Sequence, residues 1–371
     1  MYNISNSRMK ILFLTIGTEI VASSRTRIYQ FLPHLRKAGV EADVIPYDYT
    51  ETFSNILTPL FAGRGFPATE LRRALSFCSN IFNAVMRRVQ SARVLRLAAE
   101  YDAVYIQKLA LPIPFQRRLL QANPRIAFDF DDAVFSTDDE NRRAKFDGVM
   151  GMASLVTVEN EYTAAYASKF GAEVFSMTGP IDCARYAPRA MEKAPGEKIV
   201  IGWIGSGSTT PYLAAMAGLL ADLCAKHPEV RLEFIGADRI EALEGLCTYK
   251  KWTLATEAAD LENFDIGLMP LPDNEWTRGK GGYKLLQYMA TGIPSVASPV
   301  GINSVLVRDG ETGYLASTPE EWREKLERLI QAAGLRRAMG QNARREAEEK
   351  YSFEFYTPQL LSRLEKLSRS A

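Results

Sequence analysis

The segment with the clearest chemical pattern is RGKGGYKLLQYMATGIPSVASPVG, residues 278–301, in which Lys280 and Lys284 lie four residues apart. A helix that begins near Gly282 and ends at Gly292 would carry both ammonium groups at its N-terminus. Cations are unfavourable there, because that end of the helix dipole is positive. Two of them make sense around an anion of high charge, such as a phosphate or a diphosphate. The spacing therefore predicts a site for a phosphate-bearing ligand.

A second candidate phosphate site follows an apolar run in GWIGSGSTTPY, residues 202–212. Gly205, Ser206 and Ser208 are small residues that leave backbone N–H groups accessible, and we expect a helix to begin near Thr210. The start of a helix beside small residues is a common site for phosphate groups. This pattern is less specific than the lysine pair, because many strand-to-helix turns resemble it.

Three carboxylates fall within four residues in RIAFDFDDAVF, at Asp129, Asp131 and Asp132, where a predicted buried strand ends. Clustered carboxylates raise one another's pKa, which suits a general base or a group that binds a substrate hydroxyl. They are also ligands that a divalent cation accepts. The alternative is structural, with Asp132 capping a turn and Asp129 paired with a nearby Arg. The sequence leaves both interpretations open.

The turn after the first apolar run, GTEIVASSRTR at residues 17–27, places Ser24, Arg25 and Arg27 at the start of a helix expected over Arg27–Ala38 and ending at Gly39. Loops at the carboxyl ends of parallel strands are where ligands bind in doubly wound sheets. Cations at a helix start favour an anion contact there; a plain surface loop is the alternative. The turn lacks GxGxxG, so a dinucleotide fingerprint is not supported.

The chain has only two histidines, His34 and His227, and its four cysteines form no CxxC pair. A zinc ribbon, a His-rich metal centre and a disulfide framework are therefore disfavoured, and we predict no bound metal. Both histidines stand at expected helix ends before Gly or Pro, so we expect them to be exposed to solvent.

The candidate residues lie at the ends of short apolar runs that alternate with longer helical stretches. Such runs are typical of parallel sheets covered by helices on both faces. We expect one series of strands and then, after a break, a second series. The predicted strands are Lys10–Ile16, Glu41–Ile45, Ala103–Gln107, Arg125–Phe130, Leu155–Glu159 and Glu173–Ser176, followed by Lys198–Ile204, Val230–Ile235, Trp252–Leu254, Asp265–Met269, Ser295–Ala297 and Gly313–Leu315.

Two α/β domains of similar size follow from this pattern. The break at residues 181–198 contains two Pro, a Gly and several charges, which is the composition of a linker. We place the first domain at residues 1–190 and the second at residues 191–352. A last helix, within residues 353–371, would pack against one of the two domains.

The composition is that of an ordinary soluble globular protein, because 47% of the 371 residues are hydrophobic and 24% are charged. The 45 Lys and Arg residues nearly balance the 44 Asp and Glu residues, which disfavours a dedicated nucleic-acid-binding protein. The apolar run ILFLTI near the N-terminus is shorter than the core of a signal peptide or a membrane span. We therefore expect a cytoplasmic protein.

Residues 55–97 differ from the rest of the chain in charge, since they contain seven Arg and one acid, Glu70. Apolar residues are interleaved with these cations, which indicates a basic amphipathic helix pair. One interpretation is a surface for anionic membranes on the cytoplasmic face, or for an anionic acceptor. The alternative is a helical hairpin packed on its own domain with a solvated Arg face.

With these motifs together, the chain resembles a retaining glycosyltransferase of the large nucleotide-sugar-dependent family 4. The most specific parts are KLLQYMATGIPSVAS and VRDGETGYLA, and GWIGSGSTTPYL, the SSRTR loop and YSFEFY fit the same pattern. The resemblance extends over about residues 9–368. It implies the GT-B fold, in which two Rossmann-like, doubly wound domains face each other across a cleft. It also implies sugar transfer from a nucleoside-diphosphate donor to an acceptor hydroxyl, with retention, in the synthesis of surface glycans or glycolipids.

The resemblance implies that the second domain binds the nucleotide sugar and the first binds a glycan or lipid-linked acceptor. The last helix would cross back onto the first domain. The donor is a substrate, and no cofactor is implied. The implied catalytic residues are Lys284, Lys280, Asp131 and Asp132. The implied donor-side residues are Gly205, Ser206, Ser208, Gly279, Tyr283 and Gln287, and those of the acceptor-side loop are Ser24, Arg25 and Arg27.

Two positions depart from the family pattern, which pairs two Glu residues eight positions apart. Gln287 stands at the second position and can still bond a ribose hydroxyl. Gly279 stands at the first and offers no side chain. Two alternatives therefore remain beside the transferase: a nucleotide-sugar epimerase or hydrolase of the same fold, and a non-catalytic nucleotide-sugar-binding subunit. The base, the sugar, the acceptor and the oligomeric state are not determined by the sequence.

Overall fold

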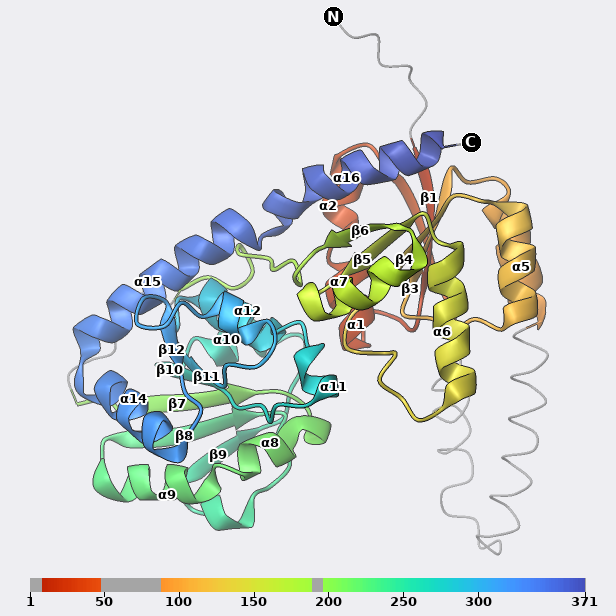
Figure 1. Cartoon of the computed structure of the whole chain (residues 1–371). Helices are drawn as coiled ribbons and strands as arrows, with labels where there is room; N and C mark the ends of the chain where they lie inside the picture. The colour runs from red at the N-terminus through yellow and green to blue at the C-terminus, as the bar shows by residue number, and fades with distance from the viewer. Residues whose placement is uncertain (1–8, 48–87, 189–195, 371) are drawn as a thin grey trace, which may run out of the picture.

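The computed structural model describes residues 9–47, 88–188 and 196–370. In this part, the chain forms two six-stranded parallel sheets, each covered by helices, and two long helices at the C-terminal end run along one side of both lobes (Figure 1). The predicted α/β class with two doubly wound sheets is confirmed.

The first sheet has the strand order β2-β1-β3-β4-β5-β6. After β1 the chain adds β2 on one side and then β3 on the other, so the order reverses between β1 and β3. Ligands bind at the carboxyl ends of strands at such a reversal. The strands are β1 (Lys10–Thr15), β2 (Glu41–Pro46), β3 (Ala103–Gln107), β4 (Ile126–Phe130), β5 (Leu155–Val158) and β6 (Glu173–Ser176).

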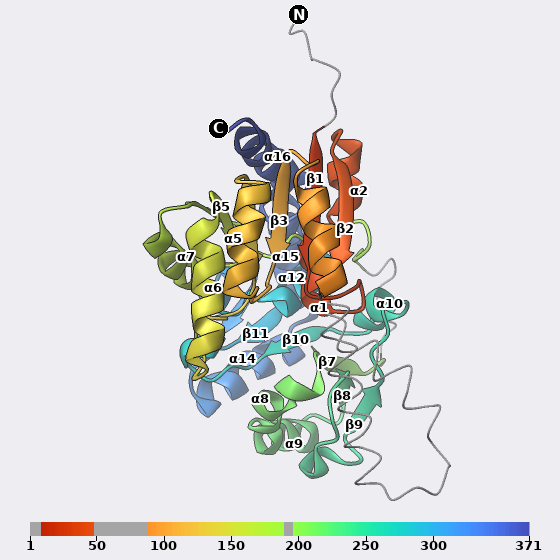
Figure 2. The ribbon, with the colours of Figure 1, turned by 90° about the vertical axis from the view of Figure 1, so that its right-hand side faces the viewer.

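Helices cover both faces of this sheet, and α5 and α6 stand side by side on one of them (Figure 2). They are α1 (Ala22–Ser24), a π-helical turn (Arg25–Tyr29), α2 (Leu32–Lys37), a helix over 88–98, α5 (Ile113–Ala122), α6 (Glu140–Met152), α7 (Glu161–Ala167) and a 3₁₀ turn (Ser168–Phe170).

The second sheet has the order β12-β11-β10-β7-β8-β9, which reverses between β7 and β10. The carboxyl ends of these two strands therefore mark its expected ligand site. The strands are β7 (Ile199–Ile204), β8 (Val230–Ile235), β9 (Cys247–Lys250), β10 (Ile266–Met269), β11 (Ser295–Ala297) and β12 (Gly313–Leu315).

The helices of the second lobe include α12, which begins and ends at glycines in the left-handed conformation, Gly282 (φ 68°) and Gly292 (φ 71°). Both bounds agree with the sequence prediction. The helical elements of this lobe are two 3₁₀ turns (Gly207–Thr209 and Glu241–Leu243), α8 (Thr210–Ala214), α9 (Ala217–Lys226), α10 (Glu257–Leu261), α11 (Glu275–Arg278), α12 (Tyr283–Thr291), α13 (Asn303–Leu306), α14 (Pro319–Gln331) and α15 (Ala333–Lys350).

The last helix, α16 (Phe353–Arg369), lies against the first lobe. Ser352 caps it by accepting a hydrogen bond from the backbone N–H of Phe355 at 3.1 Å. The ring of Phe353 packs on that of Phe31, with centroids 5.3 Å apart. One buried hydrophobic cluster accordingly runs from the first sheet through α16 to α12, while two further clusters lie within the separate lobes.

Three predictions of local structure are wrong. Trp252–Leu254 is not a strand; the edge strand β9 forms just before it, and the sequence CTYK gave no apolar run to reveal it. The helix expected from Arg27 begins at Ala22 and passes through a π turn, in which Gln30 N–H donates to the Arg25 carbonyl. His227 is buried rather than solvated, because α14 packs over it.

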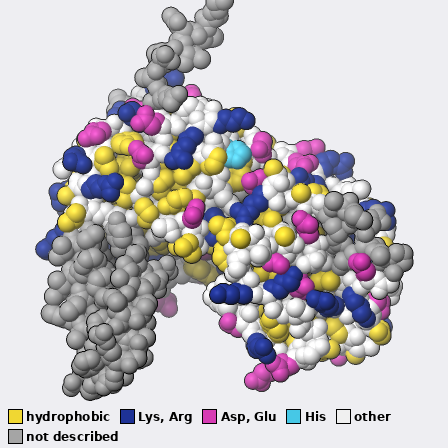
Figure 3. All heavy atoms as spheres, turned by 180° about the vertical axis from the view of Figure 1, so that it is seen from behind, with side chains coloured by type: hydrophobic (Ala, Val, Ile, Leu, Met, Phe, Trp, Pro, Cys, Tyr) yellow, Lys and Arg dark blue, Asp and Glu magenta, His cyan; other side chains and the backbone are white. Residues whose placement is uncertain are grey.

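Most of the basic stretch at residues 55–97 lies outside the described residues. The helix over 88–98 contains the described end of this stretch, and in it Gln90, Val94 and Ala98 are buried at helical spacing while Arg93 and Arg96 are exposed. This portion therefore packs on its own lobe with a solvated Arg face. On the side of the molecule drawn in Figure 3, basic and acidic side chains are intermixed over both lobes.

Candidate active site

The loops at the carboxyl ends of the two sheets lie against one another. Asn160, which follows β5, donates hydrogen bonds from its side chain to the carbonyls of Arg278 (3.2 Å) and Lys280 (3.0 Å), just before α12. Ser136 of the first lobe donates to Glu275 of α11 at 3.0 Å. The regions predicted to bind donor and acceptor therefore meet.

Lys284 lies in the first turn of α12, and its ammonium group is 5.3 Å from the centre of the Trp203 ring. A Cβ added to Gly205 would lie 2.8 Å from the Cε atom of Lys284, so the glycine lets this lysine reach the turn after β7. Burial, and then the nearby Lys280 ammonium, lower the pKa of Lys284 to about 8. A bound anion would raise that pKa again.

Lys280 faces the first lobe, where it forms an ion pair with Asp132 at 3.7 Å. Asp132 also accepts a hydrogen bond from Lys108 at 2.8 Å. Asp132 (φ 59°) and Lys108 (φ 53°) both have left-handed backbone conformations, which are uncommon for residues with side chains. Such strain is often found at functional sites. Asp132 thus lies between cations from both lobes.

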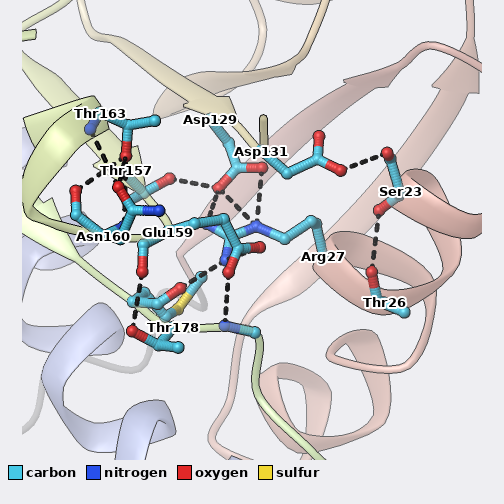
Figure 4. A network of polar contacts seen from close by, with 12 residues as sticks. Ser23, Thr26, Arg27, Asp129, Asp131, Thr157, Glu159, Asn160, Thr163 and Thr178 are labelled. Carbon is cyan, nitrogen blue, oxygen red and sulfur yellow. Dashed lines mark hydrogen bonds and ion pairs between the residues drawn. The ribbon is translucent and has the colours of Figure 1, made fainter. Parts of the chain in front are cut away.

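Asp131 is held within the first lobe by Lys108, whose ammonium lies 2.9 Å away. The Ser23 hydroxyl donates to the other oxygen of Asp131 (Figure 4). Burial acts to raise the pKa of Asp131, but the charge of Lys108 and the hydrogen bonds from Lys108 and Ser23 together lower it. The expected upward shift is therefore wrong for this residue, because an ammonium group lies between the clustered carboxylates. Asp131 is a fixed anion rather than a poised base.

Arg27 points into the first lobe, and its side chain is fully buried (Figure 4). Its Nε donates to both oxygens of Asp129 at 3.1 Å, and its Nη1 donates to Glu159 at 3.0 Å. The anion contact expected of Arg27 is therefore replaced by an internal ion pair. This pairing is the structural alternative considered for Asp129.

The other two residues predicted on the acceptor-side loop also make internal contacts. The buried Ser24 hydroxyl donates to the Gln107 side chain at 3.1 Å. The guanidinium of Arg25 lies 4.8 Å from the centre of the Trp252 ring, which belongs to the second lobe. Ser23, rather than Ser24, is the serine of this loop that reaches the carboxylates.

Gly279 packs directly on the first lobe. A Cβ on Gly279 would lie 2.5 Å from the backbone nitrogen of Ala133 and 2.6 Å from its Cβ. Any side chain at this position, including the Glu of the family pattern, is incompatible with this arrangement of the lobes. The close contact between the lobes at this point therefore requires that position 279 has no side chain.

Gln287 is buried and donates a hydrogen bond to the Tyr186 hydroxyl at 3.2 Å. That hydroxyl in turn donates to Glu257. An amide can donate to Tyr186 in this chain of contacts, whereas a carboxylate cannot. The side chain predicted to reach a ribose is thus engaged inside the second lobe here.

The remaining predicted donor-side residues lie around the same turn and helix. The Tyr283 hydroxyl donates to Gln30 of the first lobe at 3.2 Å, and burial raises the pKa of Tyr283 well above its usual value. Ser206 and Ser208 are exposed, with hydroxyl oxygens 2.9 Å apart. The structure thus groups Gly205, Ser206 and Ser208 in one turn beside Lys284.

Three residues of this site were not predicted from the sequence, namely Lys108, Glu159 and Asn160. Each stands immediately beyond the last residue of a strand or one residue further, so its position at a carboxyl edge was a usable signal. The Glu159 carboxylate accepts a hydrogen bond from the backbone N–H of Gly179 at 2.8 Å, in addition to the hydrogen bond from Arg27. Burial outweighs the Arg27 charge and raises the pKa of Glu159 to about 7.

The described ranges 9–47, 88–188 and 196–370 contain neither a candidate metal site nor a helix that could span a membrane. No group of three or more His, Cys, Asp and Glu residues has the geometry to hold a metal ion there. No helix in those ranges is long and apolar enough to span a membrane.

The sequence and the structure were compared with known proteins. Residues 199–332 match the family model described as glycosyl transferases group 1. Spore coat protein SA of Bacillus subtilis (strain 168) is 23% identical over 286 residues, which cover 66% of this chain and 75% of that protein.

Solved structures resemble this chain over nearly its whole length. Sucrose-phosphate synthase from Thermosynechococcus elongatus has a TM-score of 0.72 at 15% identity, with 97% of this chain and 99% of that one covered. Anabaena Alr3699/HepE in complex with UDP and glucose has a TM-score of 0.65 at 16% identity, with coverage of 96% and 100%. The chain therefore has the GT-B fold, and the match of its second lobe to glycosyl transferases group 1 supports a glycosyltransferase.

Proposed function

We propose that this chain is a retaining, family 4-type glycosyltransferase that moves a sugar from a nucleoside-diphosphate donor to an acceptor hydroxyl. The donor would bind to the second domain, residues 191–352, and the acceptor to the first, residues 1–190. The acceptor would be a glycan or a lipid-linked molecule used in surface glycan or glycolipid synthesis. We place the reaction in the cytoplasm, with membrane contact through residues 55–97 as part of the same proposal.

One observation carries the proposal: the Lys284 side chain lies beside the glycine turn at the order reversal of the second sheet, and the charge of Lys280 is near enough to act on its ammonium group. Lys284 lies within reach of Gly205, and Lys280 lies at the boundary between the lobes, 3.7 Å from Asp132. Cations close to one another repel, and the lowered pKa of Lys284 records that cost together with burial. A bound diphosphate would offset this repulsion, because its negative charge would lie next to both ammonium groups.

In this mechanism the barrier is departure of the diphosphate from an oxocarbenium-like sugar. Lys280, Lys284 and the N–H groups near Ser206 would stabilise the leaving charge, and one such contact is worth roughly 3–4 kcal/mol. Attack from the face of departure, with the leaving phosphate accepting the hydroxyl proton, would give retention without a protein nucleophile. The mechanism assigns charge neutralisation to side chains, so we expect turnover to persist in the presence of EDTA.

The first experiment is a thermal-shift panel with UDP, GDP, ADP and their common sugars, each in large excess. A ligand at about 100 times its Kd stabilises the folded state by roughly 2.7 kcal/mol, which raises Tm by a few degrees. We expect a shift with one diphosphate, which is lost in Lys284→Ala and kept in Lys37→Ala, a change of an exposed lysine on α2. If no diphosphate shifts the Tm, the proposed donor site is wrong.

Turnover separates the remaining alternatives. We expect Lys284→Ala to lower turnover about a hundredfold while the protein stays folded. A folded Lys284→Ala variant with near-normal turnover would remove this residue from the mechanism. Binding without transfer to any acceptor would favour a non-catalytic subunit, and product formation without an acceptor would favour an epimerase or hydrolase.

A further inference from the structure

A large cavity opens in the first lobe beside the candidate site. Its volume is about 1160 Å³, and it lies where β1, β2 and β3 end, next to the side-by-side helices α5 and α6 (Figure 2). Lys108 lines it, and the ammonium of the same residue holds Asp131 and Asp132. The cavity therefore adjoins the place where an acceptor hydroxyl would react.

The charge of this cavity is strongly one-sided. Among the described residues that line it, five are cations, Arg88, Lys108, Arg118, Arg142 and Lys145, and one is an acid, Asp139. Asp139 caps α6 by accepting the N–H of Arg142 at 2.9 Å. The whole chain, by contrast, balances 45 basic against 44 acidic residues. A concave surface of one sign attracts ligands of the opposite sign.

Most of these cations are not neutralised by the protein. In the part of the chain that the structure describes, the side chains of Arg88, Arg118 and Lys145 have no ion-pair partner. The guanidinium of Arg142 lies 5.7 Å from the centre of the Phe146 ring. Only Lys108 has its charge matched, by the two aspartates. Four cations are thus available to a ligand.

Apart from Ser91, most of the other described residues that line the cavity are apolar. The half-buried Ile16 and Tyr47 and the exposed Pro112 and Pro114 line the cavity together with the ring of Phe115. A purely polar anion would leave this surface unused, whereas a ligand with an apolar portion next to its charge would cover it. The cations and the apolar lining residues together favour a ligand that is an amphipathic anion.

We propose that this cavity binds the acceptor, and that the acceptor carries a phosphate ester or similar anionic group next to an apolar portion. The acceptor role rests on the proposed transferase function. Arg118, Arg142 and Lys145 would hold the anionic group, and the acceptor hydroxyl would extend past Lys108 toward Asp132.

The test measures binding of octyl phosphate to the full chain by titration calorimetry, below the concentration at which octyl phosphate forms micelles. Arg118→Glu and Arg117→Glu make the same charge change at adjacent exposed positions of α5, but Arg117 does not line the cavity. Reversing one charge-assisted contact should weaken binding by about tenfold or more in Arg118→Glu, and by less than about twofold in Arg117→Glu. Equal losses in the two variants, or no binding at all, would overturn the proposal.

Two further probes separate the parts of the proposed ligand. Octyl glucoside has the apolar chain without the charge, and glucose 6-phosphate has a phosphate ester without the chain. We expect both to bind more weakly than octyl phosphate. If octyl glucoside binds as tightly as octyl phosphate, the proposal that the ligand carries an anionic group is wrong. If glucose 6-phosphate binds as tightly as octyl phosphate, the proposal that the ligand has an apolar portion is wrong.

The diphosphate-induced thermal shift keeps this test distinct from that of the donor site. Arg118→Glu should retain the full shift, because Arg118 lies on the first lobe away from Lys284. If a diphosphate shifts the Tm of the unmodified chain but octyl phosphate does not bind to it, only the cavity proposal is overturned. No diphosphate shift in the unmodified chain would overturn the transferase proposal and, with it, the acceptor role.

Discussion

Gly279 of the second lobe and Ala133 of the first are packed so closely that a Cβ on Gly279 would lie 2.5 Å from the Ala133 backbone nitrogen. The neighbouring Lys280 and Asp132 form their ion pair across the same boundary. The absence of a side chain at position 279 thus sets how near the lysine of one lobe comes to the carboxylate of the other.

Gly279→Ala is expected to force the lobes apart, because the clash is with backbone and cannot be relieved by a side-chain rotation. Misplacement of reacting groups by about 1 Å can cost on the order of a hundredfold in rate. We expect a clear fall in turnover and a larger radius of gyration by small-angle scattering. Gly334→Ala is the matched control, since nothing lies within 4 Å of its added Cβ. Unchanged turnover in Gly279→Ala would show that this close approach is not needed.

Lys284 predicts a pH dependence of donor use. Its pKa is lowered to about 8, so the free protein loses the ammonium charge as the pH rises through that value. Because the diphosphate needs the charged form, kcat/KM for the donor should fall above pH 8. In Lys284→Arg the guanidinium remains protonated throughout. This variant should therefore lack the fall in kcat/KM above pH 8 (the alkaline limb of the pH profile), whatever its absolute rate. An identical limb in the arginine variant would assign the titration to another group.

The sequence was informative wherever one segment contained the whole signal. The bounds of α12 follow from Gly282, Gly292 and the apolar residues between them, all of which are local. Arg27 was misjudged because its partners Asp129 and Glu159 lie 102 and 132 residues away, and only the pairing of strands brings them together. Pairing at that distance is decided by tertiary structure.

The pKa shift expected at the aspartate cluster was wrong for Asp131 because the deciding charge is again distant in sequence. Three carboxylates within four residues suggest mutual repulsion and raised pKa values when this segment is considered alone. Lys108 comes from the end of a neighbouring strand, and its charge reverses the direction of the shift for Asp131. A prediction of electrostatics therefore fails when the decisive charge belongs to another element.

Asp132→Asn tests the contact between the lobes without disturbing the backbone, because Asn tolerates the left-handed conformation found at this position. The change removes a negative charge that raises the pKa of Lys284. We expect lower turnover and an alkaline limb displaced below pH 8. Asp138→Asn, at an exposed position nearby, should change neither. A limb that stays in place would refute the electrostatic connection between Asp132 and Lys284.

Glu159 predicts how stability changes with pH. Its pKa is raised from 4.5 to about 7, so between these values the folded chain holds a proton that the unfolded chain has released. The contribution of Glu159 to stability is therefore complete below pH 4.5 and is lost as the pH rises through 7, by at most about 3 kcal/mol. Glu159→Gln resembles the protonated form, so its Tm should be close to that of the unmodified chain at pH 5 and should exceed it at pH 8. Glu161→Gln, at an exposed position on α7, controls for loss of a carboxylate. A Tm difference for Glu159→Gln that is the same at both pH values would mean that Glu159 is ionised throughout.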